Sequence, residues 1–124
     1  FFLVISYNPG YQSVLKDLKE STKQRFAGIG FNYPGEEVEK KIIILESGVS
    51  EEIAEKLIKV SIRTRNLKGK GLHEGASTRM LIAAAKLYKS KISFIESCLK
   101  SIVLPITDDK DVRDSLERAI RDLG

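Results

Sequence analysis

The apolar residues of this chain follow two patterns, one after the other. Residues 1–10 form an apolar, β-branched run that ends in Asn8, Pro9 and Gly10, which is typical of a buried strand followed by a turn. Residues 27–31, with glycines at two positions, favour a short edge strand. We therefore expect one or two short β-strands in the first part of the chain.

The second pattern is helical and begins at Pro34, which suits the first turn of a helix. Val38, Ile42 and Leu45 recur at intervals of four and three residues, which predicts an apolar stripe that faces a core. Gly48 is expected to end this helix. The change of pattern predicts a domain boundary immediately before Pro34.

Start signals predict the helices that follow. Ser50, with two glutamates after it, is expected to cap an amphipathic helix, and Ser93 opens a capping box. Residues 76–89 are so rich in Ala, Leu and Ile that they should form the central, most buried helix. Asp108 or Asp109 is expected to cap the last helix. The fold class is therefore mainly α, a helical bundle preceded by one or two short strands.

Length and composition limit the organisation of the chain. A chain of 124 residues has room for one ordinary domain, or for a small helical domain with part of a neighbouring one. Because the sequence opens directly on Phe1 and Phe2, without Met or a polar lead, we expect a truncated chain. No apolar stretch approaches the ~18 residues of a membrane helix and no signal peptide is evident, so we expect a cytoplasmic protein.

The net charge of +4 permits binding to acidic partners. One run of basic residues contains no acid, and a solvated helix face is its simplest interpretation. No aromatic residues interleave with it, so nucleic-acid binding has little support. The alternative function is a non-enzymatic helical module that docks an acidic partner through residues 56–70. The basic residues of this segment are Lys56, Lys59, Arg63, Arg65, Lys68 and Lys70.

No metal site is expected. His73 is the only histidine and has no cysteine near it in the sequence, so zinc binding has no support. The single cysteine, Cys98, lies among apolar residues at helical spacing, and core packing is its expected role.

Three residues could take part in phosphate chemistry. Asn8 could start a turn, or its amide could orient a water that attacks a γ-phosphate. Arg25 could be a surface arginine, or an arginine finger offered to a neighbouring subunit. Arg79 lies in the first turn of an apolar helix, where a cation is disfavoured unless an anion such as ATP or a carboxylate, Glu74 for example, accompanies it.

These residues carry a resemblance to a known family. The segments FFLVISYNPGYQSVLKDLKESTKQRF, RNLKGKGLHEGASTRMLIAAAKL and LPITDDKDV resemble the C-terminal part of MoxR-type AAA+ ATPases, most closely the CbbQ/NorQ/NirQ branch. The resemblance implies that 1–33 is the end of an AAA+ α/β core and that 34–124 is the C-terminal helical lid domain. It also implies that Asn8 is sensor 1, Arg25 the arginine finger and Arg79 sensor 2, with Lys23 as the alternative finger.

The resemblance further implies a parent protein that binds ATP and Mg²⁺ and assembles as a hexameric ring. Such proteins work with a von Willebrand factor A domain partner and activate a metalloenzyme, such as nitric oxide reductase, or Rubisco. The G-x-x-x-x-G-K-[ST] phosphate loop is absent from these 124 residues. We therefore expect this chain alone to be inactive and to bind no nucleotide tightly.

Overall fold

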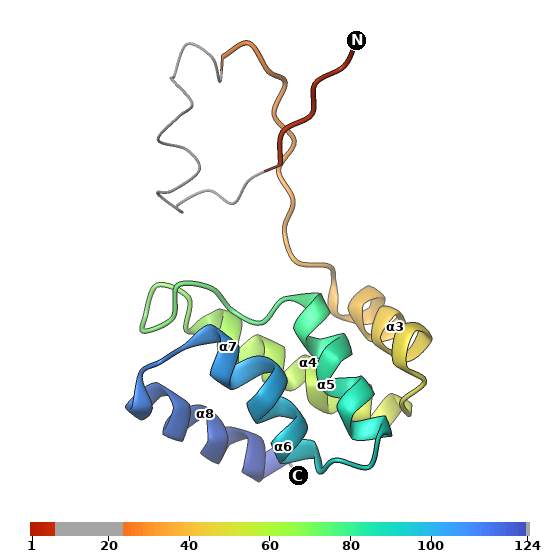
Figure 1. Ribbon diagram of the computed structural model, residues 1–124, viewed down its shortest axis with the longest axis vertical. Helices are drawn as coiled ribbons and strands as arrows, with labels where there is room; N and C mark the ends of the chain where they lie inside the picture. The colour runs from red at the N-terminus through yellow and green to blue at the C-terminus, as the bar shows by residue number, and fades with distance from the viewer. Residues whose placement is uncertain (7–23, 124) are drawn as a thin grey trace. The chain divides into compact units, whose positions relative to one another are not determined.

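The computed structural model describes residues 1–6 and 24–123. The chain divides into two compact units, Phe1–Asn32 and Tyr33–Gly124, and each is described by itself. In the first unit the described residues form a turn at 24–26 and irregular backbone elsewhere. The second unit is the helical body drawn in Figure 1.

The predicted strands are not found in the described residues. Residues 1–6 and 27–31 have no strand assignment there, and the remainder of the first predicted strand, residues 7–10, lies outside the described part. A β-strand is stabilised by hydrogen bonds to a neighbouring strand, and neither described segment has such a neighbour. The apolar, β-branched composition on which the prediction rested does not by itself supply that partner.

The first two helices of the bundle begin and end at recognisable signals. Helix α3 (Glu36–Ser47) starts after Gly35, so the prediction that Pro34 lies in the first turn is wrong by two residues. Gly48 ends α3 in the left-handed conformation, with φ of 76°, as predicted. Helix α4 (Glu51–Asn66) is capped by Ser50, whose hydroxyl accepts a hydrogen bond from the backbone N–H of Ile53.

Capping side chains also mark the starts of α5, α6 and α8. Helix α5 (Thr78–Lys89) begins two residues later than predicted and is capped by Ser77. Helix α6 (Phe94–Cys98) is capped by Ser93, as predicted. It continues without a break through a π-helical turn, η1 (Leu99–Val103), into α7 (Leu104–Ile106). Of the two predicted caps for α8 (Lys110–Leu123), the structure uses Asp109, whose carboxylate accepts hydrogen bonds from two backbone N–H groups.

The π turn ends at Val103, two residues before Pro105. Proline has no backbone N–H and its ring crowds the carbonyl of the residue four positions earlier. In η1 the N–H of Leu104 bonds to the carbonyl of Leu99, five residues back. This wider turn precedes the proline, so the helix passes Pro105 before it ends at Ile106.

The core is shared between α4 and α5. Helix α5 contacts α3, α4, α6 and η1, and Figure 1 shows it in the middle of the bundle. Its buried residues are nevertheless only Leu81, Ala84 and Ala85, so the prediction that it is the most buried helix is wrong. Helix α4 carries a longer buried face, because it packs against α3, α5 and α8. That face consists of Ile53, Ala54, Leu57, Ile58, Val60, Ser61 and Thr64.

The apolar stripe predicted for α3 is also wrong. Val38 and Leu45 are exposed, with relative accessibilities of 57% and 82%, whereas Glu39 and Ile43 are buried. The prediction assumed that apolar residues mark the inner face. Here a buried glutamate with ionic and hydrogen-bonded partners turns a different face of α3 inward.

Cys98 is fully buried, as its apolar neighbours predicted. Desolvation by this burial raises the pKa of the thiol from 9.0 to about 12. The unfolded chain therefore ionises first, so the thiol's contribution to stability is complete below pH 9 and is lost as the pH rises toward 12.

We expect the thiol of the native chain to react with a disulfide reagent at pH 8 at least ~100-fold more slowly than free cysteine, because the buried thiol yields little thiolate. The release of the coloured thiolate measures the rate. The unfolded chain in urea serves as the control and should release one equivalent at once. A native chain that reacts as fast as the unfolded one would contradict the burial of Cys98.

None of the described helices is both long enough and apolar enough to cross a membrane.

Candidate functional site

A buried polar network lies beside the start of α5. Arg65 near the end of α4 donates two hydrogen bonds to Glu39 of α3, from Nη1 to Oε1 and from Nη2 to Oε2, each 2.7 Å long. The Glu39 side chain is 1% exposed and that of Arg65 is 14% exposed. A bidentate pair of this kind is directional as well as strong. It therefore fixes both the spacing and the orientation of α3 and α4.

The same network holds the segment that leads into α5. The Nε of Arg65 donates to the carbonyl oxygen of Ala76 at 3.0 Å, and the Oγ1 of Thr64 accepts from the Ala76 backbone N–H at 2.9 Å. Thr78, the first residue of α5, donates from Oγ1 to Glu39 at 2.6 Å. Neighbouring helices thus bind the backbone N–H and C=O of Ala76. They also bind the side chain of Thr78.

Gly75 allows this close approach. A β-carbon at that position would lie 2.6 Å from the Cα of Arg65, which is closer than real β-carbons come to backbone atoms. The absence of a side chain lets the loop press against α4, where Arg65 and Thr64 can reach Ala76.

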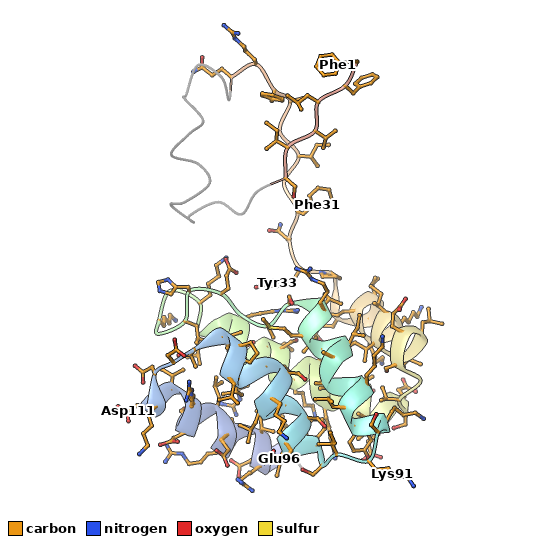
Figure 2. The ribbon with its side chains drawn as sticks, viewed as in Figure 1. Phe1, Phe31, Tyr33, Lys91, Glu96 and Asp111 are labelled. Carbon is orange, nitrogen blue, oxygen red and sulfur yellow. The ribbon has the colours of Figure 1, made fainter. Side chains whose placement is uncertain are left out.

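Tyr33 covers the outer side of the network. The ring centroid of Tyr33 lies 3.8 Å from the guanidinium carbon of Arg65, a cation–π contact. The Tyr33 hydroxyl donates to Glu74 at 3.4 Å, and Glu74 also pairs with Lys68 at 3.2 Å. Figure 2 labels Tyr33 at the end of the bundle where α5 begins. Tyr33 is also the first residue of the helical unit.

Arg79 is the second residue of α5 and is exposed. It makes no ion pair with another described residue, and Glu74, considered above as its partner, pairs with Lys68 instead. The first turn of α5 contains no acidic residue, and its backbone N–H groups carry the positive end of the helix dipole. The N-terminus of α5 and the guanidinium of Arg79 together therefore favour a nearby anion.

The other two predicted site residues belong to the first unit. Asn8 lies outside the described residues. Arg25 lies in the turn at 24–26 and is exposed. Lys23, the alternative to Arg25, also lies outside the described part. The functional roles of these residues remain predictions.

The basic segment 56–70 is less uniform than its sequence suggests. Arg65 is not part of a solvated face, because its guanidinium is paired with buried Glu39. Lys56 pairs with Glu52 at 3.7 Å and lies 5.9 Å from the ring centroid of Phe94. Lys68 pairs with Glu74. Half of the cations in this segment are therefore already engaged by the chain's own groups, and fewer remain for an acidic partner.

The described residues offer no metal centre, since they contain no group of three His, Cys, Asp or Glu side chains placed to hold an ion. His73 lines a shallow surface pocket of about 360 Å³ with Gly71 and residues 105–109. One acid of that pocket, Asp108, pairs with Arg113 at 3.3 Å.

Sequence reasoning did not find the Glu39–Arg65 pair. Glu39 reads as one of several acids that complement a helix N-terminus, and Arg65 as one of a run of surface cations. The sequence separation of 26 residues gives no local signal for their contact. The one available signal is the placement of Glu39 four residues before Ile43, on the same face of α3.

The described helices thus form a small bundle in which a buried polar network lies next to an exposed arginine at the start of α5. Residues 39–123 match the model of the family described as CbbQ/NirQ/NorQ C-terminal. The chain belongs to this family and corresponds to its C-terminal part, as the sequence motifs predicted.

Three relatives illustrate the similarity. The chain is 53% identical to Protein CbbQ of Hydrogenophilus thermoluteolus over 123 residues, 99% of this chain and 46% of that protein. It is 44% identical to the denitrification regulatory protein NirQ of Pseudomonas aeruginosa, over 88% of this chain and 42% of that protein. It is 40% identical to Protein NorQ of Paracoccus denitrificans, over 100% of this chain and 44% of that protein. The chain thus spans less than half the length of these relatives.

Proposed function

We propose that this chain is the C-terminal part of an AAA+ ATPase that activates a partner enzyme, and that its helical unit is the lid over the nucleotide. Membership of the CbbQ/NirQ/NorQ family, over nearly the whole chain, is the observation that carries the proposal. In this proposal the residues that cradle the phosphates of ATP belong to a preceding nucleotide-binding domain.

Arg79 is the proposed nucleotide contact of the lid. Its exposed guanidinium, at the N-terminal end of α5, suits the charge of a phosphate. A contact of this kind lets the lid close only when nucleotide is present. In this proposal Mg²⁺ is bound by the preceding domain together with the phosphates.

The proposed client is nitric oxide reductase or Rubisco. The name of the Pseudomonas aeruginosa relative, a denitrification regulatory protein, supports a client in denitrification. The proposed assembly is a hexameric ring with Mg-ATP between subunits and a partner that contains a von Willebrand factor A domain. Arg25 and Asn8 would then act at the subunit interface and at the attacking water, respectively.

The coding sequence upstream of Phe1 tests the class directly. A G-x-x-x-x-G-K-[ST] loop should occur within roughly 100 residues upstream, the reach of a nucleotide domain built from βαβ units. A start codon too close upstream of Phe1 to leave room for a nucleotide domain, or an upstream domain without this loop, would overturn the proposal.

Arg79→Ala in the full-length protein should weaken ATP binding by roughly 10- to 100-fold, because a charge-assisted hydrogen bond is worth ~1.5–3 kcal/mol. Titration with a fluorescent ATP analogue measures the dissociation constant. Lys86→Ala is the matched control, since Lys86 is an exposed cation in the last turn of the same helix. Equal affinities for the Arg79→Ala and Lys86→Ala proteins would show that Arg79 does not contact nucleotide.

A further inference from the structure

We propose that Arg65 is a positioning residue for Arg79, and that it links the start of the helical unit at Tyr33 to the first turn of α5. This inference rests on the proposed function, because the consequence it predicts is a change in nucleotide binding through Arg79. Arg65 itself faces inward and is 14% exposed. It is therefore placed to act on nucleotide only through other residues.

The guanidinium of Arg65 joins separate parts of the bundle. Two of its nitrogens bind the carboxylate of Glu39 on α3, the third binds the carbonyl of Ala76 in the loop before α5, and its face is covered by Tyr33. Few side chains could make these contacts together, because only arginine combines a planar cation with donors in a fixed fork. A lysine at this position could form at most part of the set.

These contacts converge on the backbone that carries Arg79. The Ala76 peptide is held at its N–H by Thr64 and at its carbonyl by Arg65. Two residues later, Thr78 is held by the carboxylate that Arg65 orients. Arg79 follows directly, on a helix whose start is thus bound on both sides. A rotation of the guanidinium would therefore shift the backbone of Arg79, from which its side chain extends.

The contact between Tyr33 and Arg65 connects the network to the residue at which the helical unit begins. Tyr33 is the first residue of the helical unit, next to Asn32 of the first unit. It is 39% exposed, so the ring can be displaced from Arg65 without opening the core. A change of backbone direction at the junction would thus reach the guanidinium, and through it the start of α5.

A purely stabilising role explains the network less well. Well-packed apolar side chains in place of a buried ion pair are often as stable or more stable. What the bidentate pair adds is a defined orientation. The groups it orients are the two anchors of the segment before Arg79, namely Ala76 and Thr78.

A double-mutant cycle in the full-length protein tests the inference. Arg65→Lys should raise KM for ATP about tenfold, a coupling of ordinary size for residues in one network, with a smaller change in kcat. In an Arg79→Ala background the same substitution should raise KM less than about twofold, because the residue through which it acts is gone. Arg63→Lys, an exposed position on the same helix, is the matched control and should leave KM unchanged.

Substitution of Tyr33 gives a second test, which leaves the buried Glu39–Arg65 pair in place. Tyr33→Leu removes the contact with the guanidinium and should raise KM by roughly two- to fivefold, the worth of an exposed cation–π contact. Tyr33→Phe keeps the ring over Arg65 and should restore the wild-type KM.

The outcomes separate the two levels of the proposal. If Arg79→Ala itself leaves nucleotide binding unchanged, the proposed nucleotide contact of the lid fails, and the inference about Arg65 fails with it. If Arg79→Ala weakens binding but Arg65→Lys raises KM by the same factor in both backgrounds, Arg65 is merely structural and the inference is overturned. Should Arg65→Lys fail to fold, a wild-type KM for Tyr33→Leu would overturn the inference equally.

Discussion

Replacing Glu39 by alanine should lower the free energy of unfolding of this chain by about 3–5 kcal/mol, the usual cost of removing one partner of a buried ion pair. The carboxylate is 1% exposed and accepts hydrogen bonds from Arg65 and Thr78. Its removal leaves a guanidinium in a protein interior without its counter-charge. Urea unfolding followed by circular dichroism at 222 nm measures the change in the helical unit.

Two further variants make this result specific. Glu37→Ala, on the same helix, removes an exposed carboxylate that is 3.4 Å from Lys40 and should cost less than ~1 kcal/mol. The double variant Glu39→Leu with Arg65→Met replaces both charges by apolar groups and should recover most of the lost stability. A Glu39→Ala chain as stable as the Glu37→Ala chain would contradict the buried pair.

Arg25→Ala should reduce ATP hydrolysis by the full-length protein by a factor of order 10³ while leaving nucleotide affinity nearly intact, if Arg25 acts as other arginine fingers do. The expected separation arises because a finger completes the pocket of a neighbouring subunit and stabilises charge mainly in the transition state. Steady-state hydrolysis and equilibrium binding, measured on the same preparation, give the two quantities. Arg118→Ala, an exposed arginine on α8, is the control.

Mixing subunits tests whether Arg25 acts on its neighbour. Under the proposed function, the Arg25→Ala protein would keep an intact pocket, and a full-length protein with its phosphate-loop lysine replaced would keep an intact finger. Mixed rings would contain interfaces that pair the two, so some activity should return on mixing. If mixed rings form and no ratio recovers activity, Arg25 does not act across the interface.

The parts of the fold that could be predicted are those with local causes. Ser50, Ser93 and Asp109 cap helices because their side chains reach backbone N–H groups two or three residues away. Gly48 ends α3 because it can adopt a positive φ. Such signals lie within a single turn of helix and depend little on the rest of the chain.

The inner face of α3 could not be predicted in this way. Its position depends on Arg65, which lies 26 residues from Glu39 in the sequence, and on Thr78, which lies 39 residues away. A pattern of apolar residues favoured Val38 and Leu45 instead, both of which are exposed. Long-range polar contacts override the local pattern here, because a buried carboxylate must face its partners.

The candidate site shows the same division. Arg79 was predicted as a site residue because a cation in the first turn of an apolar helix is locally unfavourable, and because the segment around it resembles a known family. The network behind it gave no such signal, since each of its members has an ordinary local explanation. Only the packed helices bring Tyr33, Glu39 and Arg65 together.

The close approach at Gly75 restricts how this sequence can vary over time. A single substitution there would force the loop away from α4, since even a methyl group would lie 2.6 Å from the Arg65 backbone. A side chain at position 75 would therefore require either the loop or α4 to shift, and a shift of α4 would move the partner of Glu39. We expect a substitution of Gly75 to weaken the ion pair, although residue 75 itself makes no contact with the carboxylate.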